Sequence, residues 1–190
     1  MLQLHISKSL TPDLKSHMCD SSDNPGAMQW YAHRVHVLRR KCVIVMERES
    51  RYAILFNGLT RPDFARFPEL LRGRLFREVL SICHLQNDQA ARLAALVDLV
   101  TDIVEVMPGN DRSVQSHINQ VVFEFDWMAQ EIGALPESED QEFNFGLRIN
   151  QTPRKRKGDR NYFIPMEVFQ GFWSGLLEHM AVSHNDQIFH

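Results

Sequence analysis

The densest run of basic side chains lies at residues 153–160, where the sequence reads PRKRKGDR and continues into Asn161, Tyr162 and Phe163. Cations beside aromatic rings suit single-stranded nucleic acid, because the charges contact phosphates while a ring stacks on a base. A solvated loop, balanced by the acidic segment 137–142, explains the same run without a function. The residues predicted to bind nucleic acid or another partner here are Arg154, Lys155, Arg156, Lys157, Arg160 and Tyr162.

A second basic segment, formed by Arg39, Arg40 and Lys41, falls at a predicted turn between two strands. These three cations are candidates to extend the basic surface of residues 153–160. The net charge of the whole chain is only −3, from 21 Lys and Arg against 24 Asp and Glu, so the total predicts no charged partner. Any nucleic-acid prediction therefore depends on these local clusters.

The polar residues His33, His117 and Asn119 are the candidates for an enzyme pocket assembled from distant parts of the chain. The sequence carries no GxSxG, Walker or GxGxxG motif, so no catalytic residue and no cofactor are predicted. His33 and His36 lie three apart in a predicted strand and would point to opposite faces of it. No HExxH motif is present, and no metal site is predicted.

The strands that must position these side chains are predicted from apolar alternation and composition. Leu2, Leu4 and Ile6 alternate with polar residues, as in a half-buried strand. Residues 29–56 are rich in Val, Ile, Tyr, Trp and Phe and are interrupted by two short charged turns, which is typical of an antiparallel meander. We expect its strands at 30–38, 42–47 and 52–57, and a further strand at 143–149.

The middle strand of this meander is apolar at every position from Cys42 to Met46. That pattern indicates a central strand covered on both faces, while the helices are expected over one face of the sheet. Apolar residues at three- and four-residue spacing predict the helices, with Pro165 at one start and Gly133 at one end. The expected helices are a short one at 11–18, one over 60–82 that Pro68 kinks, and others at 87–104, 110–132 and 165–182.

Together these elements predict an α+β fold, in which a small antiparallel sheet of about four to five strands packs against about four to five helices. The chain has 190 residues, of which 44% are hydrophobic and 24% charged, and a single domain over 1–190 is expected. Mobile loops are expected at 19–27, 136–142 and 151–161, and the C-terminus is expected to fray over 183–190.

The cysteines and the apolar runs indicate the compartment. Cys19, Cys42 and Cys83 lie far apart in the sequence, which fits reduced thiols better than disulfides. No stretch approaches the roughly 20 apolar residues of a membrane span, and the N-terminal residues do not resemble a signal peptide. The sequence therefore predicts a soluble cytoplasmic protein that does not contact a membrane.

The segment from Trp30 to Phe64 resembles an uncharacterised bacterial family of domains of unknown function. Its members are similar in having a tryptophan-led strand, a basic turn with Lys-Cys before an apolar strand, and a third strand that leads into a helix. In this sequence the last two features are Arg40-Lys41-Cys42 and Tyr52 to Phe56. The resemblance implies a bacterial or mobile-element origin, such as a phage, and brings no activity, cofactor or catalytic residue.

The sequence leaves three functions open. The first is a non-enzymatic cytoplasmic binding or regulatory protein that acts through a macromolecular partner. The second is a nucleic-acid-binding protein that uses the loop 153–160, and the third is an enzyme whose site is assembled from distant His and Asn residues. A symmetric homodimer is the general expectation for a soluble bacterial protein.

Overall fold

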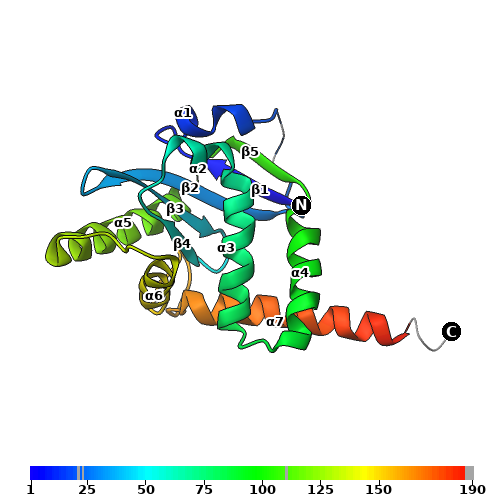
Figure 1. Ribbon diagram of the computed structural model, residues 1–190. Coiled ribbons are helices and arrows are strands. Elements are labelled where there is room, and N and C mark those ends of the chain that lie inside the picture. The colour runs from blue at the N-terminus through cyan, green and yellow to red at the C-terminus, as the bar shows by residue number, and fades with distance from the viewer. Residues whose placement is uncertain (21, 23, 110, 187–190) are drawn as a thin grey trace.

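The strands form one mixed sheet (Figure 1). The computed structural model describes residues 1–20, 22, 24–109 and 111–186. In this part of the chain the strands are β1 (Leu2–Ile6), β2 (Met28–Val37), β3 (Arg40–Glu47), β4 (Ala53–Phe56) and β5 (Val104–Pro108). Their order in the sheet is β4-β3-β2-β1-β5, with β1 parallel to both β2 and β5 and the other pairs antiparallel. The predicted meander and the α+β class are confirmed, while the parallel strand pairs make the sheet mixed.

The helices begin and end where local capping chemistry allows. Thr60 and Asp63 form a capping box at the start of α2. Asp111 accepts hydrogen bonds from the first backbone N–H groups of α5, and Gly133 ends that helix with a left-handed φ of 75°. The helices are α1 (Thr11–Leu14), the 3-10 turn η1 (Lys15–His17), α2 (Arg61–Ala65), α3 (Phe67–Ile82), α4 (Asn87–Thr101), α5 (Arg112–Ile132), α6 (Glu139–Asn150) and α7 (Pro165–Asp186).

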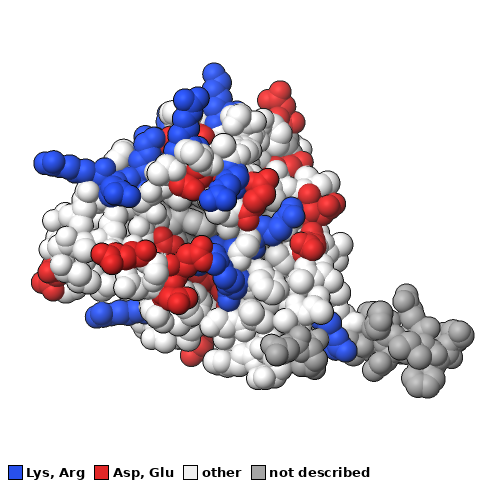
Figure 2. All heavy atoms as spheres, in the orientation of Figure 1, with Lys and Arg blue, Asp and Glu red and all other residues white. Residues whose placement is uncertain are grey.

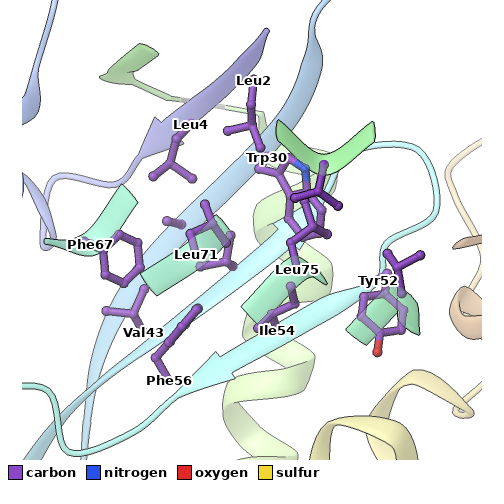
Figure 3. Packing of buried hydrophobic residues seen from close by; sticks show 14 of the residues in the cluster. Leu2, Leu4, Trp30, Val43, Tyr52, Ile54, Phe56, Phe67, Leu71 and Leu75 are labelled. Carbon is purple, nitrogen blue, oxygen red and sulfur yellow. The ribbon is translucent and has the colours of Figure 1, made fainter. Parts of the chain in front are cut away.

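Helices cover both faces of the sheet. On one face, side chains of β1 to β5 pack against α3, α4 and α7, and Phe169 and Trp173 of α7 are almost completely buried there. Figure 3 shows part of this core, with Leu2, Leu4, Trp30, Val43, Tyr52, Ile54, Phe56, Phe67, Leu71 and Leu75.

On the other face, Ile44 and Leu55 belong to a second core with α5 and α6. Residues 42–46 are therefore covered on both faces, as predicted. The expectation of helices over one face only is wrong, because the alternating side chains of β3 and β4 supply an apolar set to each face.

Two elements differ from the sequence prediction. Residues 143–149 are helical and not a strand, since Ser138 caps α6 by accepting from the N–H of Gln141 and acidic residues fill the first turn. Helix α6 therefore also takes up part of the expected loop 136–142. Val104–Pro108 is strand β5 and not a helix end, because it pairs with β1 along its whole length. The expected fraying over 183–190 lies partly outside the described residues, as do positions 21 and 23 of the loop 19–27 and position 110 of the expected helix 110–132.

The β2–β3 hairpin extends past both neighbouring strands. β1 pairs with β2 only as far as Ala32, and β4 pairs with β3 only from Val43 onward. Residues 33–42 therefore lie beyond the ends of β1 and β4 (Figure 1). Leu38 and Arg39 form the turn with φ values of 46° and 63°, the left-handed pair that suits a two-residue hairpin turn.

A buried polar network joins the segment before β4 to α3 and α6. The Tyr52 hydroxyl donates to Glu78 at 2.5 Å, and Arg74 bridges Glu78 at 2.7 Å and Glu142 at 2.8 Å. Burial raises the pKa of both carboxyl groups, Glu78 and Glu142. The network therefore supplies hydrogen bonds to side chains that the fold has removed from water.

The last residue of α6 pairs with the edge strand β4. The Asn150 side-chain oxygen accepts from the Ala53 N–H, and its NH2 group donates to the Ala53 carbonyl, both at 2.8 Å. Asn150 is fully buried and satisfies two backbone groups as a neighbouring strand would.

Among the described helices, none is long and apolar enough to cross a membrane.

Candidate functional site

The loop between α6 and α7 is closed by its own backbone. Arg154 and Phe163 pair as in an antiparallel bridge, with N–O distances of 2.8 and 2.9 Å. The Arg154 side chain is 2% exposed and donates to the Gln120 side chain on α5 at 3.0 Å. This predicted phosphate ligand is thus directed into the protein.

Arg156 is also engaged inside the loop. Its guanidinium pairs with Asp159 at 3.0 Å, donates to the Glu49 carbonyl at 3.0 Å and lies 4.8 Å from the centre of the Phe163 ring. The side chains that remain exposed are those of Lys155, Lys157, Arg160 and Tyr162. Tyr162 is 70% exposed, and the Lys155 ammonium lies 5.6 Å from the centre of its ring.

A chain of hydrogen bonds, here called the Arg51–His117 clasp, fixes the loop to the rest of the protein. Arg51, in the β3–β4 turn, donates from Nε to His117 Nδ1 at 3.0 Å and from Nη2 to the Ser113 hydroxyl at 3.1 Å. His117 Nε2 lies 3.2 Å from the Lys155 carbonyl oxygen. The clasp therefore links α5, the β3–β4 turn and the loop, which are distant in the sequence.

The geometry of the clasp determines the protonation state of His117. Because Nδ1 accepts from Arg51, the proton of the neutral ring lies on Nε2 and is donated to the Lys155 carbonyl. Burial lowers the pKa of His117, and the positive charges of Arg51, Arg154 and Arg156 lower it further, against the opposing effect of the Lys155 carbonyl. Both ring nitrogens are engaged, so the arrangement orders the loop.

Arg51 combines burial with an uncommon backbone conformation. It is 5% exposed and has a φ of 60°, in the left-handed region that non-glycine residues seldom occupy. Burial lowers its pKa, while the charge of Asp111 opposes that shift. Such a residue persists only where surrounding contacts hold it, and here those contacts are Ser113 and His117.

The three predicted pocket residues occupy different environments. His117 is buried in the clasp, whereas Asn119 is exposed on α5 and accepts from Gln115 at 2.9 Å. His33 is half-buried in β2 opposite Ile44, and burial lowers its pKa. Among the described residues, no hydrogen bond joins these three side chains, and no three His, Cys, Asp or Glu groups could hold a metal ion.

The second basic segment lies at the opposite end of β3 from the loop. Arg39 and Arg40 are exposed at the hairpin turn, and Lys41 pairs with Asp13 at 2.7 Å. The loop instead contacts Glu49 and Arg51, beyond the other end of the strand. A strand of eight residues is about 26 Å long, so the two segments are separate surfaces.

The solvent face of α5 carries two exposed aromatic side chains. Phe123 is 73% exposed and Trp127, one turn further along, is 53% exposed. Phe123 follows Gln120, the partner of Arg154, by three residues, so the pair lies beside the attachment of the loop. We call Phe123 and Trp127 the aromatic surface.

One comparison with known proteins identifies a family. The family model of DUF6933, described as a domain of unknown function, matches residues 3–168. The chain belongs to the DUF6933 family. No curated protein matches it.

The residues of the clasp and of the aromatic surface all lie within the part that matches DUF6933. Helix α7 lies almost entirely beyond the matched residues, including Phe172, which is 50% exposed. Phe172 lines a pocket of about 420 Å³ together with Met28 and Leu176, and Arg48 lies at its edge. This pocket combines α7 with parts of the DUF6933 sheet.

Sequence reasoning did not identify Arg51, Ser113 and Gln120 in this DUF6933 chain. Arg51 falls in a charged turn and looks like any solvated residue, and its contacts with α5 are formed 62 and 66 residues away. The only local indication of a special position is the change from the charged Arg51 to Tyr52 directly before an apolar strand. The exposure of Trp127 was likewise undetermined, because an aromatic residue in an amphipathic helix usually belongs to the core.

Proposed function

We propose that this chain is a non-enzymatic binding protein that acts through a macromolecular partner, and that the partner contacts the aromatic surface. The observation that carries the proposal is the exposure of Phe123 and Trp127 side by side on α5. Large aromatic side chains are enriched at interface cores and are costly to leave in water. Two such side chains next to each other form a surface that a partner stabilises by covering it.

The clasp supports this proposal because it orders the loop against α5, the helix that carries the aromatic surface. The loop is attached to α5 through Arg154 and through the Lys155 carbonyl, which contacts His117, and to the β3–β4 turn through Arg156. A surface that is already ordered loses less conformational entropy when a partner binds. The engagement of both nitrogens of His117 also favours a structural role for this residue over acid–base chemistry.

Nucleic-acid binding through the loop is a second candidate function. It is favoured by Tyr162 and Lys155, an exposed ring with a cation beside it, which suits stacking on a base. Against it, Arg154 and Arg156 are held by Gln120, Asp159 and Glu49, so only Lys155, Lys157 and Arg160 are available for phosphates. For the binding protein proposed here we also expect a single domain, a cytoplasmic location, a bacterial origin and a homodimer.

A photo-crosslinking amino acid at position 123 tests the proposal in cells that express the full chain. The matched control carries the same amino acid at Leu99, which is 65% exposed on α4. We expect a discrete crosslinked macromolecule from position 123 that is absent from position 99 and is lost when Trp127 is also changed to Ser. Equal crosslinking from both positions, or none from position 123, would overturn the proposal.

A further inference from the structure

We infer that the free end of the β2–β3 hairpin, together with α1 and the start of α2, contacts the phosphate backbone of double-stranded nucleic acid. We call this the hairpin surface, and its exposed cations are Lys8, Lys15, Arg39, Arg40 and Arg61, with Lys41 partly exposed. None of these cations belongs to the aromatic surface, so the inference goes beyond the proposed function.

The contacts of the hairpin bring these cations to one end of the molecule. Lys41 and Arg34 both pair with Asp13 of α1, and the Lys41 ammonium lies 5.4 Å from the centre of the Phe64 ring in α2. Ser9, which follows the exposed Lys8, donates to the Arg34 carbonyl at 2.9 Å. The segment after β1, helix α1 and helix α2 therefore flank the projecting hairpin.

The tip of the hairpin is held in a defined shape. The guanidinium of Arg40 lies against Gly58, where a Cβ atom would be only 3.3 Å from Arg40 Nη2. Gly58 also has a φ of 63°, which favours glycine. A paired two-stranded ribbon with cations at its turn is a shape that the grooves and backbone of a duplex can accept.

The acidic residues at this end are neutralised by internal contacts. The Asp13 carboxylate is bound by both Arg34 and Lys41, and these bonds hold its pKa below the ordinary value although burial acts to raise it. The Asp63 carboxylate accepts from Thr60 and pairs with Arg66. The Asp13 and Asp63 carboxylates are therefore paired within the protein, whereas Lys8, Lys15, Arg39, Arg40 and Arg61 remain exposed to a polyanion.

The space-filling view agrees with this distribution. Figure 2 shows Lys and Arg at the hairpin end and over α1, with some Asp and Glu side chains between and beside them. Glu137 and Glu139 mark one boundary, because they line a pocket of about 560 Å³ together with Arg40. A polyanion is therefore directed toward the α1 and α2 side of the hairpin.

The exposed hydrophobic side chains indicate whether the hairpin surface suits a duplex or a single strand. Among the described residues, the exposed large hydrophobic side chains include no ring between Leu2 and Phe64. Single-strand binding uses exposed rings on which bases stack, and Tyr162 at the other end of β3 is such a ring. Apart from the exposed imidazole of His36, the hairpin surface offers charge without rings for stacking, which fits the backbone of a paired duplex.

Fluorescence anisotropy with a labelled duplex of about two helical turns tests the inference across a salt series from about 50 to about 200 mM. The test variant is Arg39→Ala/Arg40→Ala/Arg61→Ala, and the matched control Lys155→Ala/Lys157→Ala/Arg160→Ala removes the same charge from the loop. We expect binding that weakens with salt, roughly tenfold or greater loss in the hairpin variant, and little change in the loop variant. Circular dichroism establishes that both variants are folded.

No duplex binding at the lowest salt, or an equal loss in both variants, would overturn the inference. Binding to anionic lipid vesicles but not to the duplex would also overturn it, and would assign the charge to a membrane surface. A preference for the single strand that is lost in the loop variant would support the second candidate function instead. Duplex binding by Phe123→Ser/Trp127→Ser separates this test from that of the proposed function, because those residues lie outside the hairpin surface.

Discussion

At the scale of single residues, His117 makes stability depend on pH. Its folded-state pKa lies below the unfolded value of 6.5, so the unfolded chain binds more protons between those two values. The stabilisation is complete above about pH 6.5 and is lost as the pH falls toward the folded-state pKa. We expect the free energy of unfolding, measured by urea denaturation, to decrease from pH 7 to pH 5.

The variant His117→Gln is the control for this prediction. The Gln side-chain oxygen can accept from Arg51 and its NH2 group can donate to the Lys155 carbonyl, so both bonds of the clasp are kept without a titrating group. We expect the decrease in stability from pH 7 to pH 5 to be smaller in His117→Gln, with the remaining pH dependence coming from His33, whose pKa burial lowers, and from Glu78 and Glu142, whose pKa values burial raises. An identical pH dependence in both proteins would contradict the assigned role of His117.

The buried network around Glu78 can be tested by substituting Tyr52. Tyr52→Phe removes the hydroxyl that donates to Glu78 and leaves that buried carboxyl short of a partner. We expect a loss of about 1–3 kcal/mol in the free energy of unfolding. The control is Tyr162→Phe, where the exposed hydroxyl should change stability by less than about 0.5 kcal/mol. Equal effects of the two substitutions would contradict the network.

The sequence located the basic loop but could not show how its side chains are used. Arg154 and Lys157 belong to the same run and have the same charge, yet one is buried and the other exposed. The difference arises from the backbone bridge to Phe163 and from Gln120, both of which are tertiary contacts. Composition therefore predicts a charged segment, whereas only the fold assigns each charge to a partner or to solvent.

At the scale of elements, Asn150 determines how α6 meets β4. Asn150→Ala leaves the N–H and carbonyl of Ala53 without their partners in a buried position. We expect a loss of roughly 2–4 kcal/mol, since each unsatisfied buried group costs about 1–3 kcal/mol. Faster hydrogen exchange at the Ala53 amide should accompany it, and an unchanged exchange rate would contradict the pairing.

The elements that the sequence predicted are those whose patterns are local. Strand composition and turns predict the meander, and a long apolar stripe predicts α5. β5 was missed because Val104 continues the apolar spacing of α4, and only pairing with β1 makes it a strand. The prediction of a strand at 143–149 was wrong because a short apolar segment fits both the two-residue period of a strand and the 3.6-residue period of a helix. Here the N-cap at Ser138 favours the helix.

At the scale of the whole molecule, the aromatic surface should contribute to binding and not to folding. Phe123→Ser/Trp127→Ser removes exposed rings, so we expect the free energy of unfolding to change by less than about 0.5 kcal/mol per site. Solubility should rise because an exposed apolar area is removed. A large loss of stability in urea denaturation would instead show that these rings pack against part of the chain.

The position of β1 has a consequence for the synthesis of the chain. Gln3 in β1 bonds Glu105 in β5 across a sequence separation of 102 residues, and that pairing closes one side of the first strand. At about 5–20 residues per second, a ribosome makes the intervening chain in roughly 5–20 s. During that interval the nascent first strand has one side open to pairing with other chains. β1 is thus made well before the strand that protects one of its sides, and the rate of translation sets how long that side stays exposed.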